Sequence, residues 1–281
     1  METLASVAHV RKRVVCGTCP RGCPLGEGEQ GVCGAVENLD GVLVNARLGA
    51  AFRLRMGRRS SPFSRFLPGE HFLTIESRGS GLKPAVTTPI DIWWEGPDSA
   101  PRLTADEAVF LGRAWGCKGV FLETDDPYFA AGTGEQILRR ARDYSLRTAV
   151  ATSGYLCAGA RRTLLELVDA VELLFYGVSP GVYHRLFAVR PEPVFETVAA
   201  LAGRSCPTVE VVVPLIPGEN DSTAEVGKLA RFLLERLGPG IPVAFAAEDP
   251  ALPDERLASA CAEALGAGLS DIHSLARAEP T

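Results

Sequence analysis

The sequence predicts an α/β fold built on a parallel sheet, preceded by a small cysteine-rich module. Helical and strand-like patterns alternate from about residue 104 onward, and the candidate strands are short and strongly apolar. Half of the eight cysteines also lie close together, between Cys16 and Cys33. Alternation of this kind is typical of βα units, in which helices cover a sheet of neighbouring parallel strands.

Seven segments have the composition of strands. Each is a short run of apolar and β-branched residues with helical patterns between it and the next run. The expected strands are Phe72–Glu76, Gly119–Glu123, Arg147–Thr152, Ala170–Tyr176, Thr208–Pro214, Ile241–Ala246 and Asp271–Ser274.

Six amphipathic helices are expected between these strands, which predicts a barrel or an open barrel. Thr104 is followed three residues later by Glu107, and Ser222 by Glu225, so two of the helices begin with a capping box. The expected helices are Thr104–Trp115, Gly134–Tyr144, Gly159–Val168, Pro191–Gly203, Ser222–Leu237 and Asp254–Gly266.

The composition is that of a folded protein. The chain has 281 residues, of which 46% are hydrophobic and 22% charged, and this excludes disorder throughout. No stretch approaches the roughly 20 apolar residues that a membrane helix needs. The first residues also lack the apolar region of a secretory signal. We therefore expect a cytoplasmic protein with no membrane partner.

The net charge of −5 is unevenly distributed. Residues 1–66 carry ten basic side chains and five acidic ones, so the remainder of the chain is strongly acidic. A basic segment can bind nucleic acid, but it can also dock on the acidic body of its own chain. The arginines of residues 53–59 could contact phosphates, but no known nucleic-acid motif accompanies them. Docking or a protein partner is therefore favoured over nucleic acid.

The strongest chemical signal is the array C-x-x-C-x-x-x-C-x9-C formed by Cys16, Cys19, Cys23 and Cys33. Thiolates at such short spacings on Gly- and Pro-rich turns can converge on one ion, which predicts a metal site. Structural zinc is the direct interpretation, and a [4Fe–4S] cluster also takes four cysteines. The alternative without a metal is four reduced thiols packed as small hydrophobic groups.

Several segments resemble the radical SAM proteins of the AmmeMemoRadiSam system, which are relatives of pyruvate formate-lyase-activating enzymes. The resemblance covers nearly the whole chain and includes the cysteine array through Gly34, Glu37-Asn38-x-Asp40-Gly41, Phe66-Leu67-Pro68-Gly69, Asp125-Asp126-Pro127, Ser153-Gly154-Tyr155 and the run from Leu215 to Ser222. It implies a radical-SAM-like partial (β/α)6 barrel over residues 71–281, with the four-cysteine module over residues 1–70.

One departure from the family pattern concerns its principal cofactor. Family members carry C-x-x-x-C-x-x-C after the first barrel strand, where three thiolates hold a cluster and leave one iron open to S-adenosylmethionine. In residues 77–87 of this chain, Ser80, Pro84 and Thr87 stand at those three positions. Proline cannot ligate iron and neutral hydroxyls are poor ligands for it, so the usual cluster is not expected to form.

The same comparison predicts an altered barrel interior. Leu174-Phe175-Tyr176-Gly177 stands where the family has Asp-Leu-Lys-Gly, so a charged pair facing the lumen has become apolar and aromatic. Whether S-adenosylmethionine still binds is left open by these differences.

Four residues are candidates for cofactor binding. Asp125 and Asp126 follow a strand, and the carboxyl ends of strands are where βα barrels bind ligands. Ser153 stands at the end of the next strand. Glu210 alternates with valines on a central strand, so it points into the lumen or pairs with a basic residue, because a buried carboxylate needs a partner. No catalytic residue is assigned.

Three hypotheses about function follow. The first is a degenerate radical SAM homologue that is non-catalytic or depends on a partner, with a structural metal on the N-terminal cysteines. The second is an active S-adenosylmethionine-dependent enzyme whose [4Fe–4S] cluster is held by those same cysteines. The third is a zinc-ribbon-like nucleic-acid adaptor.

Overall fold

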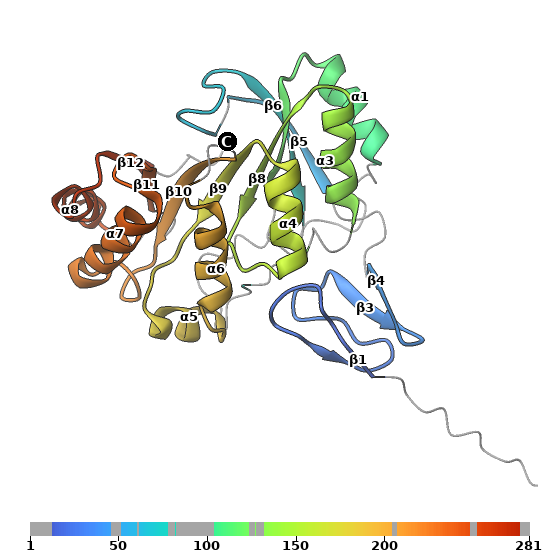
Figure 1. Cartoon of the computed structure of the whole chain (residues 1–281), viewed down its shortest axis with the longest axis horizontal. Coiled ribbons are helices and arrows are strands. Elements are labelled where there is room, and N and C mark those ends of the chain that lie inside the picture. The colour runs from blue at the N-terminus through green and yellow to red at the C-terminus, as the bar shows by residue number, and fades with distance from the viewer. Residues whose placement is uncertain are drawn as a thin grey trace, which may run out of the picture.

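The computed structural model describes residues 13–45, 52–60, 62–77, 82, 104–123, 127, 132–203, 207–247 and 252–275. Their main element is an eight-stranded sheet in the order β12-β11-β10-β9-β8-β7-β6-β5. Figure 1 shows this sheet with helices packed along it and a small separate module, coloured blue, beside one end.

Seven strands of the sheet are parallel and follow one another in chain order. They are β6 (His71–Ser77), β7 (Gly119–Glu123), β8 (Arg147–Thr152), β9 (Ala170–Leu174), β10 (Thr208–Leu215), β11 (Pro242–Ala247) and β12 (Asp271–Leu275). The predicted α/β class with a partial (β/α) barrel is therefore confirmed. β5 (Phe52–Ser60), which was not expected as a strand, pairs antiparallel with β6 at the edge of the sheet.

The helices are α1 (Ala105–Ala114), α3 (Thr133–Asp143), α4 (Ala158–Leu167), α5 (Pro180–Phe187), α6 (Glu192–Leu201), α7 (Thr223–Leu237) and α8 (Asp254–Gly266). Six of them match the predicted helices to within two residues at each end. α5 was not expected. It begins with Pro180 and is only eight residues long, so its periodicity is too short to stand out.

The two faces of the sheet are packed differently. On one face, strand residues such as Leu122, Val171 and Val213 are completely buried among helix side chains, including Ile137 and Leu233. This core explains why the strands read as continuous apolar runs, since parallel strands in such folds are covered on both sides.

The opposite, concave face carries a second and smaller cluster. Phe72 and Phe121 belong to it with small residues on β8 and β9, and so does Phe63, whose ring meets that of Phe121. Because Ala149 and Ala170 fill little space, they leave room for that ring. The concave face is therefore filled near the amino ends of its strands by the protein's own side chains.

The N-terminal module has little regular structure of its own. It contains β1 (Val14–Val15) paired with β2 (Pro24–Leu25), and a hairpin of β3 (Val36–Leu39) and β4 (Val42–Asn45). Asp40 and Gly41 form the hairpin turn with φ of 54° and 81°, as a tight hairpin requires. Completely buried Asn38 ties the hairpin to β2 by donating to the carbonyl of Leu25.

Residues 52–70 belong to the first segment in the sequence analysis, yet they contribute β5 and several contacts to the large sheet. The boundary at residue 70 itself stays a prediction. No helix in the described ranges combines the length and the apolar character needed to cross a membrane.

Candidate functional site: the barrel mouth and the cysteine module

The carboxyl ends of the parallel strands meet at one end of the barrel, which we call the mouth. After β8, the turn through Ser153 is held by packing and hydrogen bonds. Gly154 has a φ of 73°, and a Cβ on it would lie 3.2 Å from a methyl group of Leu173. The hydroxyl of Thr197 on α6 donates to the carbonyl of Gly154 over 2.6 Å. Ser153 is thus buried in a turn whose backbone is fixed by its neighbours.

A buried asparagine joins two further strand ends at the mouth. The Nδ2 of Asn220 donates to the carbonyls of Tyr176 and Pro214, over 2.9 and 2.8 Å. Its Oδ1 accepts from the amide of Ile216. The segments after β9 and β10 are therefore held in one fixed arrangement by a single side chain.

The N-terminal module contacts this same end of the barrel. Nη2 of Arg21 donates to the carbonyl of Phe187, the last residue of α5, over 2.6 Å. Tyr155, next to the Ser153 turn, has a raised pKa, first because of burial and then because of the nearby thiol of Cys19. The cysteine module is therefore docked at the mouth, beside the end of β8, as Figure 1 shows for its position below α4.

The four cysteines of the module lie close to one another. Cys16 and Cys19 are buried, and Cys23 and Cys33 are half-buried. Burial raises the pKa of Cys19 to about 12, with smaller contributions from the other three thiols. The pKa of Cys33 is also raised by burial, with Cys16 and Cys23 contributing. The fold therefore disfavours the charged thiolates unless a cation accompanies them.

Glycine makes room between two of these thiols. A Cβ on Gly31 would lie 3.6 Å from Sγ of Cys33 and 4.0 Å from Sγ of Cys23. A donor set of four soft thiolates fits zinc and fits an iron–sulfur cluster. Among the described residues, however, no group of three or more His, Cys, Asp or Glu side chains is already arranged as a set of metal ligands. Binding would therefore require the four sulfurs to move closer together.

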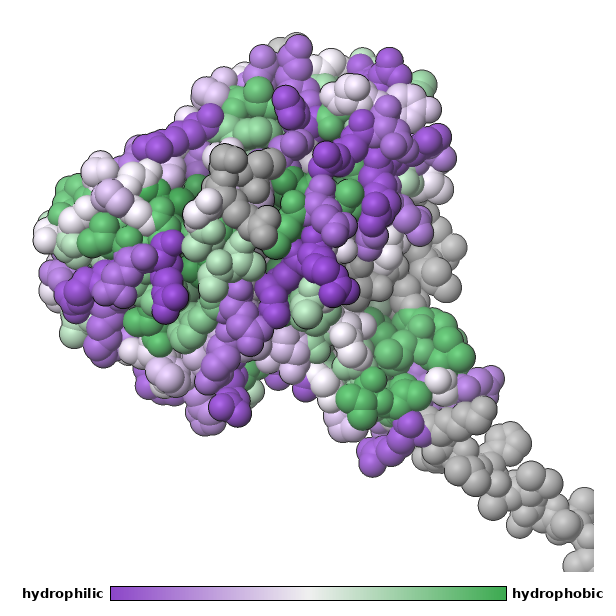
Figure 2. Space-filling view, viewed as in Figure 1, coloured by the Kyte–Doolittle hydropathy of each residue, from purple (hydrophilic) through white to green (hydrophobic). Residues whose placement is uncertain are grey.

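Apolar side chains are exposed on the same module. Figure 2 shows hydrophobic residues gathered over it, at the lower right of the view. They include Val15 and Val42, whose exposed fractions are 70% and 61%, together with Val32 and Leu39. Exposed apolar surface of this density is more than isolated surface residues normally provide.

Two of the four predicted cofactor-binding residues lie among the described residues. Asp125 and Asp126, and the loop positions Ser80, Pro84 and Thr87, lie outside the described residues. Ser153 is at the mouth. Glu210 is level in the sheet register with Ala151, two residues before Ser153.

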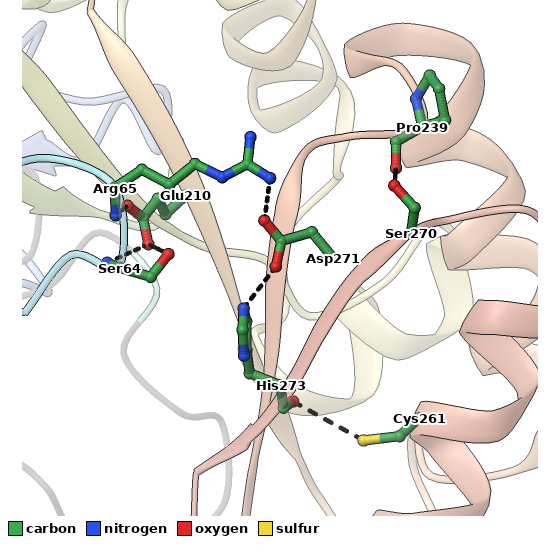
Figure 3. A network of polar contacts seen from close by, with 8 residues as sticks. All are labelled: Ser64, Arg65, Glu210, Pro239, Cys261, Ser270, Asp271 and His273. Atoms are coloured by element: carbon green, nitrogen blue, oxygen red, sulfur yellow. Dashed lines mark hydrogen bonds and ion pairs between the residues drawn. The ribbon is translucent and has the colours of Figure 1, made fainter.

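The carboxylate of Glu210 is hydrogen-bonded to other residues of the chain. Its carboxylate accepts hydrogen bonds from the amide and hydroxyl of Ser64 and from the amide of Arg65, each 2.8 Å long (Figure 3). The expectation that this buried carboxylate would be paired is thus met by backbone groups from a segment 145 residues earlier in the chain. Its role in cofactor binding stays a prediction.

The predicted change in the barrel interior can be traced at the end of β9. Leu174 stands on the concave side and is half-buried, whereas completely buried Phe175 stacks on Phe232 of α7. Tyr176 packs edge-on against Phe187. Sequence reasoning missed Arg21 and the segment around Ser64, because neither carries a local pattern that marks its distant partner.

Comparisons with known proteins support the fold and a distant relationship. No protein-family model matches the chain. It is 26% identical over 243 residues to the uncharacterized protein MJ0808 of Methanocaldococcus jannaschii, covering 85% of this chain and 71% of that protein. It is 27% identical over 140 residues to the isethionate sulfite-lyase activating enzyme of Oleidesulfovibrio alaskensis, covering 49% of this chain and 44% of the enzyme.

Solved structures resemble the barrel. SuiB of Streptococcus suis bound to its precursor peptide SuiA has a TM-score of 0.50 and 12% identity, covering 63% of this chain and 43% of SuiB. A domain of the pyruvate-formate lyase-activating enzyme of Bacteroides vulgatus has a TM-score of 0.49 and 15% identity, covering 57% of this chain and 99% of that domain. A radical SAM methyltransferase of Sphaerobacter thermophilus has a TM-score of 0.45 and 22% identity, covering 63% of this chain and 58% of the enzyme.

This chain spans less than half the length of the activating enzyme and of SuiB. The likeness to SuiB is one of fold alone, and the likeness to the activating enzyme is one of sequence over about half of this chain. The comparisons thus show a likeness in fold to SuiB and a partial likeness in sequence to an activating enzyme.

Proposed function

We propose that this protein is a degenerate relative of radical SAM enzymes that is non-catalytic or depends on a partner, and that it carries a structural metal on Cys16, Cys19, Cys23 and Cys33. One observation carries the proposal: residues 77–87, which follow the first parallel strand, contain no cysteine. Without three thiolates at this place, the loop has no ligands suited to an iron–sulfur cluster.

The packing of the concave face supports the loss of catalysis. Phe63 and Phe121 meet edge to face at 5.8 Å within the cluster that covers this face. Glu210, the buried carboxylate on this side of the central strands, is saturated by three hydrogen bonds from the chain itself. This carboxylate is therefore already engaged within the chain, whereas the buried hydroxyl of Thr74 on the same face has no hydrogen-bond partner among the described residues.

The four-cysteine module supports a structural metal. Four thiolates would close the coordination shell of a zinc ion, which supplies folding energy to modules too small to fold by packing alone. The described part of the module has only a small core around Cys16, Leu25 and Val36. Its exposed Val15 and Val42 support the dependence on a partner protein.

A second candidate function is favoured by the position of the module. Arg21 holds it against α5, and Cys19 and Cys23 influence the pKa of Tyr155 at the mouth. A [4Fe–4S] cluster on these cysteines would thus lie at the end of the barrel where ligands bind. Three of the thiolates would hold it, leaving one iron open to S-adenosylmethionine and preserving an active enzyme.

The two candidates differ in metal and spectrum. The protein is purified without oxygen, its zinc and iron are measured, and its absorbance near about 400 nm is recorded. We expect one zinc for each chain and no chromophore. Four irons with a brown colour and a paramagnetic signal that responds to S-adenosylmethionine would contradict the proposal and establish the second candidate. The Cys16→Ser/Cys19→Ser double variant should lose the bound metal, whereas Cys261→Ser, outside the module, should retain it.

A further inference from the structure

A short segment crosses the concave face of the sheet and contacts strands that lie far apart in it. We call residues 62–67, which follow β5, the strap. Its first contact is apolar: Phe63 is almost completely buried, and its ring meets those of Phe121 on β7 and Phe66 at 5.8 Å, both nearly perpendicular. Phe66 in turn lies 6.1 Å from Phe72 on β6. The strap is thereby fixed to the β6–β7 side of the sheet.

The second contact is with β10. One carboxylate oxygen of Glu210 accepts from both the amide and the hydroxyl of Ser64, and the other accepts from the amide of Arg65. Glu210 is level in the register with Glu172 on β9, so two carboxylates stand side by side on one face. Like charges in that arrangement repel each other. Three donors from the strap therefore offset a cost that the sheet alone would impose.

The third contact reaches the far edge of the sheet. The guanidinium of Arg65 pairs with Oδ2 of Asp271, the first residue of β12 (Figure 3). The other oxygen of Asp271 lies 2.6 Å from Nε2 of His273 on the same strand. Arg65 thus binds β10 through its backbone and β12 through its side chain.

These contacts can coexist only on a strongly curved sheet. β7 and β12 are five strand spacings apart, which is about 24 Å in a flat sheet. The backbone from Phe63 to Arg65 spans at most about 7 Å. Side chains cover part of the remaining distance, and the curvature of the sheet brings β7 and β12 closer together. The strap therefore runs straight across the concave face between them.

The turn that follows the strap has the backbone conformation expected of a segment that its surroundings hold in place. Leu67 has a φ of 48°, in the left-handed region that a leucine rarely adopts, and its carbonyl accepts from the amide of Glu70. A conformation of this kind is retained only where the surroundings impose it.

We propose that the strap is a latch that closes the barrel at the amino ends of its strands, and that release of Glu210 or Arg65 frees the edge strand β12. In the part of the chain that the structure describes, β12 pairs with β11 on one side only, so it depends on the strap more than an inner strand does. The latch is independent of the metal and of catalytic activity, so it can be tested on the protein in its purified, metal-loaded form.

The test is hydrogen exchange of the full chain in three variants. Arg65→Ala should speed exchange in β12 by about tenfold and leave the amide of Ser64 protected, because it removes the ion pair alone. Glu210→Gln should speed exchange in both the strap and β12. Ser64→Ala removes one of the three hydrogen bonds and should have a smaller effect in the strap.

Arg139→Ala is the matched control, since it removes an arginine ion pair with Glu135 on the surface of α3, away from the strap. This variant should change the hydrogen-exchange rate of neither the strap nor β12. Unchanged exchange of the strap and β12 in both Arg65→Ala and Glu210→Gln would overturn the proposal. If Glu210→Gln does not fold, Arg65→Ala and Ser64→Ala still test the proposal. Each removes a single partly exposed contact, so both are expected to fold.

Discussion

The two ends of the barrel are completed in different ways. At the amino ends, the strap fills the concave face with Phe63 and satisfies the carboxylate of Glu210 with its own backbone. At the mouth, the chain places a module with four thiols, two of which, Cys19 and Cys33, have a pKa raised by burial. The amino end of the barrel is thus closed by packing and hydrogen bonds. The mouth instead carries four cysteine sulfurs that are suited to bind a metal ion.

The largest effect is expected from removing metal ligands at the mouth. Cys16→Ser/Cys19→Ser should abolish metal binding and with it the protection of residues 13–45 against hydrogen exchange, because a structural zinc contributes about 10 kcal/mol to a small module. The parallel sheet should keep its own unfolding transition. Retained protection of residues 13–45 in the double variant would contradict this, and Cys117→Ser serves as the control.

A clash at the closed end should cost less, but should affect the whole barrel. A Cβ on Gly119 would lie 2.5 Å from the carbonyl oxygen of Arg147 and 2.5 Å from the ring of Phe72. Neither neighbour can withdraw, because one is a strand backbone and the other packs under Phe66. Gly119→Ala should therefore lower the free energy of unfolding by about 2–3 kcal/mol, as measured by urea denaturation.

Gly227 supplies the matched control for this substitution. A Cβ there would also meet an atom at 2.5 Å, but that atom is the terminal oxygen of Glu263, a side chain that can rotate away. Alanine also favours the interior of α7, so Gly227→Ala should be neutral or slightly stabilising. If Gly119→Ala were as stable as Gly227→Ala, the clash at Gly119 would be relieved and Phe72 would not be held in place at the closed end.

The same contrast explains which parts of the fold the sequence predicts. The strands Gly119–Glu123 and Arg147–Thr152 and the helix Asp254–Gly266 agree with the structure to the residue, because their apolar patterns are determined by the core. β5 was read as a run of charge, because the alternation of Phe52, Leu54 and Met56 with arginines is short and breaks at Gly57-Arg58-Arg59. α5 was missed because eight residues give barely two turns of periodicity.

The candidate site was predicted in its ingredients but not in its assembly. The spacing of the cysteines predicts a metal site, which stays a prediction, and the structure places Cys19 near Tyr155, next to the Ser153 that the sequence also singled out. The burial of Glu210 implied a partner, yet nothing local identifies Ser64 as that partner, since 146 positions separate them. Long-range pairing of a carboxylate with backbone amides leaves no pattern in the sequence.

A smaller effect is expected where the module meets the barrel. Arg21→Ala removes the hydrogen bond to the carbonyl of Phe187 and should weaken docking by about 1–2 kcal/mol. Hydrogen exchange at Tyr155 and in the module should become several times faster as a result. Arg185→Ala, which removes an ion pair between α5 and Glu219, is the control and should leave Tyr155 unchanged. No change in Arg21→Ala would show that other contacts hold the module at the mouth.

The smallest effect concerns α1, whose first turn lies on the mouth side and is completed locally. The hydroxyl of Thr104 accepts from the amide of Glu107, whose carboxylate accepts in return from the amide of Thr104. Thr104→Ala should lower the free energy of unfolding by about 1 kcal/mol, as typical N-cap losses do. Urea denaturation measures this loss. If Thr104→Ala were as stable as the original protein, α1 would be fixed by packing alone.

The pH dependence of this cap has a definite sign. Hydrogen bonds from the backbone and side chain of Thr104 lower the pKa of Glu107 below its usual value of 4.5. A carboxyl group with a lowered pKa in the folded state contributes stability above its unfolded pKa, and that contribution is lost as the pH falls through the folded one. The difference in melting temperature between the original protein and Glu107→Gln should therefore be present at neutral pH and disappear in acid. A difference that persists at about pH 2 would mean that α1 depends on the shape of the Glu107 side chain and not on its charge.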